Sequence, residues 1–147
     1  MIENRHFQRD RFKILKVESY EGKTPAIGTH EARQLLAAPD GESLKGKRDR
    51  AILATLLNHA LRRVELCALK VKDVHARRGV PHFRAHGKGG KLRYLPIHVG
   101  TWELISDYLV AAGHVDDRDG ALFRPLKNNT TGALDCAPTA DGFSPTM

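Results

Sequence analysis

Long hydrophobic runs are missing from this sequence of 147 residues. No stretch of about eighteen consecutive apolar residues occurs, which argues against a membrane-spanning helix, and the polar start, residues 1–5, does not resemble a secretory signal peptide. Cysteine is scarce as well. Cys67 and Cys136 are too few and too far apart for a disulfide framework or a cysteine-based zinc site. We therefore expect a cytoplasmic protein with reduced thiols and no membrane partner.

Acidic residues are scarce in the first two thirds of the chain. Residues 1–93 hold 21 Lys and Arg against 10 Asp and Glu, whereas residues 94–147 hold 3 against 7. The densest stretch, residues 62–93, carries ten basic side chains and two acidic ones. Such a concentration of positive charge attracts polyanions and indicates a nucleic-acid partner. The alternative is a solvated basic face that binds nothing.

What the sequence does contain is helical periodicity, in a composition that is 41% hydrophobic and 28% charged, typical of a globular domain. Apolar residues recur every three or four positions in residues 49–61 and 101–112, and residues 62–69 keep helical character. A short helix is expected to begin at Thr29. The Lys- and Gly-rich residues 45–48 are predicted to form a loop.

The period changes after this helical part. Residues 81–86 and 91–96 alternate between polar and apolar on either side of residues 87–90, Gly-Lys-Gly-Gly, which predicts a β-hairpin. Further on, Leu122 and Phe123 look strand-like. The expected fold class is therefore α+β, mainly helical with a small antiparallel hairpin or sheet.

The hairpin carries the most informative side chains. Because side chains alternate along a strand, polar groups that share a face can be identified, and we expect five of them to line one side of the hairpin: His82, Arg84, His86, Lys91 and Arg93. Lys88 would sit at the tip between glycines that let the backbone approach a phosphate closely. The alternative is a soluble hairpin whose lysine only protects the sheet edge from aggregation.

A second candidate is the pair Arg62 and Glu65. An arginine near the start of a helix can present its donors bidentately to a phosphate. Glu65, three residues later, is placed to hold the guanidinium or to cap the turn. The alternative is an ordinary surface ion pair, which stabilises little.

Metal-binding and cofactor patterns are not found in the sequence. His82 and His86 would stand about 13 Å apart on a strand, too far for one ion. The acidic loop at residues 116–120 lacks the alternation and the closing Glu of a calcium loop. We expect neither a metal nor a cofactor.

Two segments together resemble a known family. Residues 58–74, NHALRRVELCALKVKDV, resemble the first arginine box of the tyrosine recombinase (phage integrase) family, in which a small residue, Leu and Arg are followed by an acid, Leu, Leu-Lys and Asp. Residues 86–97, HGKGGKLRYLPI, resemble the β-hairpin box that carries the catalytic lysine of the family. The resemblance covers roughly residues 25–143, and finding both boxes in order makes it specific.

The resemblance implies a reaction and roles in it. The family breaks and rejoins double-stranded DNA through a phosphotyrosyl link, without metal or cofactor, and its members act with other recombinase subunits. Arg62 would be the first phosphate-binding arginine, Lys88 the general acid for the departing 5′-oxygen, and Glu65 the acid that supports the arginine turn. Six further side chains would contact DNA: Arg63, His86, Lys91, Arg93, Lys47 and Arg48.

In the family, the second half of the site is an HxxR box, which supplies a histidine and a second arginine, then a His or Trp and the nucleophilic tyrosine. This half has no counterpart in these residues. After His98 no histidine is followed three positions later by arginine, and the last tyrosine is Tyr108, which falls on the apolar stripe of its helix and is predicted to be a core residue. We therefore predict no nucleophile.

These features predict an incomplete catalytic domain. Residues 1–24 would be a leader or the remnant of an interdomain linker, residues 25–126 a partial tyrosine-recombinase catalytic domain, and residues 127–147 a poorly ordered, truncated tail. The predicted function is that of a DNA-binding fragment of a site-specific recombinase, inactive alone. The alternative is a non-catalytic protein that binds DNA or interferes with an intact recombinase.

Overall fold

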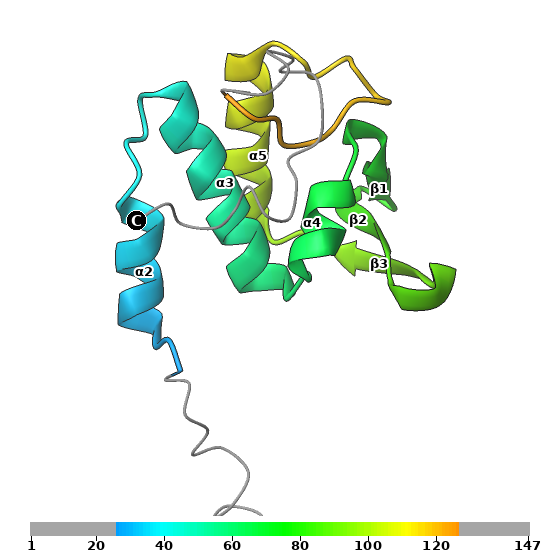
Figure 1. Cartoon of the computed structure of the whole chain (residues 1–147), viewed down its shortest axis with the longest axis horizontal. Coiled ribbons are helices and arrows are strands. Elements are labelled where there is room, and N and C mark those ends of the chain that lie inside the picture. The colour runs from blue at the N-terminus through cyan, green and yellow to red at the C-terminus, as the bar shows by residue number, and fades with distance from the viewer. Residues whose placement is uncertain (1–25, 127–147) are drawn as a thin grey trace, which may run out of the picture. The chain divides into compact units, whose positions relative to one another are not determined.

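The computed structural model describes residues 26–126 (Figure 1). The predicted leader and tail, residues 1–24 and 127–147, lie outside the described residues. The chain divides into two compact units, residues 1–31 and 32–147, and every predicted site residue belongs to the second. No helix in the described part is long and apolar enough to cross a membrane.

Helices form the larger part of the fold, and α3 and α5 pack side by side (Figure 1). The α-helices are α2 (Thr29–Ala37), α3 (Leu44–His59), α4 (Arg63–Ala68) and α5 (Val99–Ala112), and the short 3-10 helices are η1 (Val71–Asp73) and η2 (Lys88–Gly90). The prediction of a mainly helical α+β domain with a small antiparallel sheet is confirmed.

Helix α3 begins earlier than predicted, and the loop expected at residues 45–48 is wrong. These residues form the first turn of α3, because the Ser43 side chain caps the helix and accepts the backbone N–H of Gly46 at 3.0 Å. Gly46 is buried, and a Cβ added there would overlap the backbone carbonyl of Asp40. The glycine therefore serves a close approach of two backbones and does not mark a loop.

Substituting Gly46→Ala is expected to destabilise the protein by about 1–3 kcal/mol through this overlap. In a helix interior, replacing glycine by alanine usually raises the unfolding free energy by about 1 kcal/mol, so the effect expected here has the opposite sign. The matched control is Gly100→Ala in α5, where the nearest atoms to the new Cβ belong to the His98 ring, at 3.5 Å. Urea unfolding measures both variants, and an unchanged or higher unfolding free energy for Gly46→Ala would contradict the prediction.

The predicted hairpin is confirmed and belongs to a three-stranded antiparallel sheet. Its strands, in the order β1-β2-β3, are β1 (Val74–Arg77), β2 (Val80–His86) and β3 (Leu92–Pro96). Strand β1 was not predicted. The strand expected at Leu122 and Phe123 is wrong, since only Ala121 forms an isolated bridge, with Lys70. Leu122 and Phe123 are both buried in the core instead.

The register of the hairpin overturns the expected common polar face. Ala85 pairs with Arg93, and Arg84 pairs with Tyr94, so Arg93 lies on the sheet face of Ala85 while Arg84 lies on the opposite one. The turn causes this offset, because Gly87 donates its N–H to Lys91 at 2.8 Å and leaves three residues between them. Gly89 and Gly90, each with a φ of 74°, supply the left-handed conformations of the turn.

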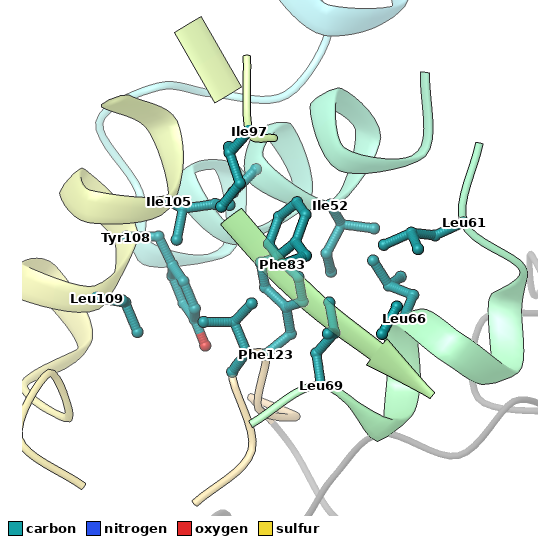
Figure 2. Packing of buried hydrophobic residues seen from close by; sticks show 13 residues of the cluster. Ile52, Leu61, Leu66, Leu69, Phe83, Ile97, Ile105, Tyr108, Leu109 and Phe123 are labelled. Atoms are coloured by element: carbon teal, nitrogen blue, oxygen red, sulfur yellow. The ribbon is translucent and has the colours of Figure 1, made fainter. Parts of the chain in front are cut away.

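The core lies between the sheet and the helices, with Phe83 of β2 at its centre (Figure 2). Ile52 of α3 and Leu66 of α4 lie on one side of Phe83, and Ile105 and Tyr108 of α5 lie on the other (Figure 2). Tyr108 is 1% exposed, which confirms it as a core residue, and burial raises the pKa of its hydroxyl. This packing fixes α4 and the sheet relative to each other.

Candidate phosphate-binding site

Arg62 lies at the junction between α3 and α4. Ala60, in a left-handed conformation with a φ of 49°, ends α3, and Arg62 is extended and precedes the first residue of α4. The Arg62 side chain is 71% exposed. The local backbone therefore places a guanidinium at the surface where α4 begins.

His59 ties this junction to the start of α5. Its Nε2 accepts the backbone N–H of His98 at 3.1 Å, and its Nδ1 lies 3.1 Å from the carbonyl oxygen of Thr55. Burial lowers the pKa of His59, with a smaller contribution from His98. The neutral ring, with its proton on Nδ1, satisfies both bonds.

Glu65 is the centre of the site. Its side chain is 5% exposed, and its Oε2 accepts the backbone N–H of Arg62 at 2.8 Å. Nη2 of Arg93 donates to Oε1 at 2.8 Å and to Oε2 at 2.9 Å, whereas Nη1 of Arg62 lies 3.6 Å from Oε1. The backbone hydrogen bond, with the charges of Arg93 and Arg62, holds the pKa of Glu65 below its ordinary value despite burial, so the carboxylate is ionised at neutral pH.

The turn of the hairpin comes close to the same carboxylate. A Cβ added at Gly87 would lie 3.6 Å from Oε1 of Glu65, so the backbone just before Lys88 stands beside Glu65. Lys88 itself is exposed in η2. The structure thus brings the loop that carries Lys88 and the helix start that carries Arg62 to the same buried carboxylate.

The other predicted DNA contacts fall into two groups. Lys47 pairs with Asp107 at 2.6 Å. Arg48 pairs with Asp49 at 2.9 Å and donates to the carbonyl oxygen of Arg124 at 3.0 Å, so both cations have partners within the protein. Of the other predicted contacts, Arg63, His86 and Lys91 are exposed and make no ion pair in the described part of the chain.

A second buried acid, missed in the sequence, repeats the arrangement of Glu65. Oδ2 of Asp73 accepts the backbone N–H of Lys70 at 3.0 Å, and Oδ1 accepts Nε and Nη2 of Arg84 at 3.0 and 2.8 Å. Both acids of the basic stretch 62–93 are therefore buried and paired with a sheet arginine. Asp73 is the Asp of the first arginine box and lies three residues after a helix start, which predicts a cap but not an arginine partner.

No group of three or more His, Cys, Asp or Glu side chains within residues 26–126 could hold a metal ion. Two tyrosines of this part lie away from Glu65. Tyr108 is in the core, and Tyr94 shares the sheet face of Arg84, opposite to Arg93, with the Arg77 guanidinium 4.3 Å from its ring centre. The arrangement can therefore bind an anion through arginine and lysine, with neither of these hydroxyls beside it.

Comparison with known proteins agrees with the two sequence boxes. The model of the phage integrase family matches residues 26–133. Tyrosine recombinase XerC of Pelobacter propionicus is 36% identical over 125 residues, which are 84% of this chain and 39% of the XerC chain. Tyrosine recombinase XerD of Vibrio cholerae is 38% identical over 79 residues, 54% of this chain and 26% of XerD.

A solved structure shares the fold. The crystal structure of XerA recombinase aligns with a TM-score of 0.59 and 24% sequence identity, over 85% of this chain and 41% of that one. The present chain therefore spans well under half the length of these curated and solved relatives.

Proposed function

Because the chain belongs to the phage integrase family, we propose that its described residues form the phosphate-binding half of a catalytic site that breaks and rejoins double-stranded DNA. The observation that carries this proposal is the convergence of two segments on Glu65. One segment brings Arg62 at the start of α4, and the other brings Lys88 in the hairpin turn.

In this proposal each cation has a distinct task at the scissile phosphate. The exposed Arg62 guanidinium donates to non-bridging oxygens, where negative charge grows in the transition state. The Lys88 ammonium donates a proton to the departing 5′-oxygen. Arg63, His86 and Lys91, exposed and without an ion pair in residues 26–126, contact the flanking DNA backbone.

We further propose that the 147 residues alone bind DNA without cleaving it. They contain neither the family's HxxR box downstream of the hairpin nor a tyrosine after Tyr108. Catalytic residues act as a unit, so the loss of some of them lowers activity in a grossly non-additive way. A tyrosine from another recombinase subunit would not supply the second arginine and the histidine.

A nicked suicide duplex separates binding from cleavage. The 147-residue chain is expected to retard the duplex in a gel but to leave no covalent protein–DNA adduct after denaturation in detergent. Binding should weaken in Arg62→Ala, and it should not change in the control Lys45→Ala, whose side chain is exposed and pairs with Asp49 on α3. A phosphotyrosyl adduct would contradict the proposed lack of cleavage, and the absence of any retardation would contradict the proposed DNA binding.

A further inference from the structure

We propose that Arg93 is a positioning residue, which neutralises Glu65 and thereby leaves the Arg62 guanidinium available to bind a phosphate. The inference rests on the proposed function, because it assigns a reason why Arg62 is free to bind DNA. It also replaces the expectation that Arg93 itself contacts the DNA backbone.

The hairpin register determines the face of the sheet on which Arg93 lies. Arg93 pairs with Ala85, which is 1% exposed, so the Arg93 side chain leaves β3 on the core-facing side of the sheet. On that side it contacts both oxygens of Glu65, at 2.8 and 2.9 Å. A register shifted by one residue would have directed Arg93 to the opposite face, away from α4.

The buried Glu65 side chain needs partners for its charge. A buried carboxylate needs a cation and hydrogen bonds to offset the loss of water. The Arg62 backbone N–H supplies one of these bonds at 2.8 Å, and Arg93 supplies two more. Glu65 therefore accepts three hydrogen bonds from groups other than the Arg62 side chain.

The Arg62 side chain lies near Glu65 without a close contact to it. Its Nη1 is 3.6 Å from Oε1 of Glu65, which is beyond an ordinary hydrogen bond, and the side chain is 71% exposed. In the absence of Arg93, Arg62 would be the cation nearest to the buried charge. A small rotation would then close the Arg62–Glu65 pair and withdraw the guanidinium donors from a phosphate.

The test is a salt titration of duplex binding by the 147-residue chain and its variants. The slope of log K against log salt falls by about one for each lost phosphate contact. Arg62→Ala and Arg93→Ala are each expected to lower its magnitude by about one, and the double variant by about one as well, since both changes remove the same contact. A decrease of about two in the double variant would show that Arg93 contacts its own phosphate and would overturn the inference.

Removing the buried charge provides an independent arm. In the Glu65→Gln background no carboxylate competes for Arg62, so Glu65→Gln/Arg93→Ala is expected to keep the slope of Glu65→Gln. A further decrease of about one would contradict the inference. This comparison remains valid even if a thermal melt shows that the single variant Arg93→Ala is unfolded. Arg93→Lys, which keeps a cation beside Glu65, should bind as the unsubstituted chain does.

The controls separate failure of the inference from failure of the proposed function. The exposed Arg118 in the loop after α5 provides a charge-matched control, and Arg118→Ala should leave the slope unchanged. If Arg62→Ala also leaves it unchanged, the proposed phosphate contact fails, and the inference with it. If Arg62→Ala lowers the slope while Arg93→Ala does not, only the role of Arg93 is overturned.

Discussion

Phe83→Ala is expected to lower the free energy of unfolding by about 3–5 kcal/mol, the usual cost of removing a buried aromatic ring. Phe83 is fully buried in the middle strand of the sheet and makes an edge contact with the His59 ring, the centroids 5.1 Å apart. Its loss would leave a cavity where β2 packs against the helices. Since small domains have a total stability of about 5–15 kcal/mol, this variant should lose a large share of its stability and unfold at a lower temperature.

Leu92→Ala is the matched control for this prediction. Leu92 is also an apolar strand residue, but it is 46% exposed in β3, so its truncation should cost less than about 1 kcal/mol. Urea denaturation followed by circular dichroism compares the two variants. A cost below about 1 kcal/mol for Phe83→Ala would contradict the central place of its ring in the core.

The affinity for a short DNA duplex is expected to fall about a hundredfold between 50 and 200 mM salt. Four exposed cations at the start of α4 and in the hairpin turn are proposed to contact phosphates: Arg62, Arg63, Lys88 and Lys91. Four contacts give a slope near −3.6 in a plot of log K against log salt. At physiological salt the binding should be weak and tolerant of sequence, with a dissociation constant of about 10⁻⁴–10⁻⁶ M.

Lysine variants test whether the hairpin turn carries half of this salt dependence. Lys88→Ala/Lys91→Ala should lower the magnitude of the slope by about two, whereas Lys45→Ala, on α3, should leave it unchanged. Fluorescence anisotropy with a labelled duplex at several salt concentrations gives both slopes. An affinity independent of salt would contradict phosphate contacts as the source of binding.

Local signals in the sequence were sufficient for much of the fold. The apolar stripe of α5 and the stop at Gly113, which is left-handed with a φ of 69°, could be predicted because both depend on neighbouring residues. The hairpin followed from the glycine-rich turn and the flanking alternation. The start of α3 was missed although Ser43 is a local N-cap signal, because Gly46 beside it is typical of a loop and its backbone contact with Asp40 does not show in local composition.

The sequence suggested residues for the site but not their geometry. Arg62, Glu65 and Lys88 are predicted site residues because the family boxes fix their spacing, and their roles stay predictions. The partner of Glu65 could not, since Arg93 reaches it only through the three-residue turn, and one residue more or less in that turn reverses the face of every side chain in β3. The Asp73–Arg84 pair was missed for a related reason, because it joins η1 to a strand through tertiary packing.

The proposed site requires Arg62 and Lys88 to face the same bound DNA, which chemical footprinting can measure. The 147-residue chain is treated with phenylglyoxal for arginine and with an acylating reagent for lysine, with and without duplex, and the modified residues are identified by mass spectrometry. Bound duplex is expected to protect both Arg62 and Lys88 and to leave Lys45 and Arg118 as reactive as in the free protein. If bound duplex leaves Arg62 and Lys88 as reactive as these two controls, the proposed site does not bind DNA.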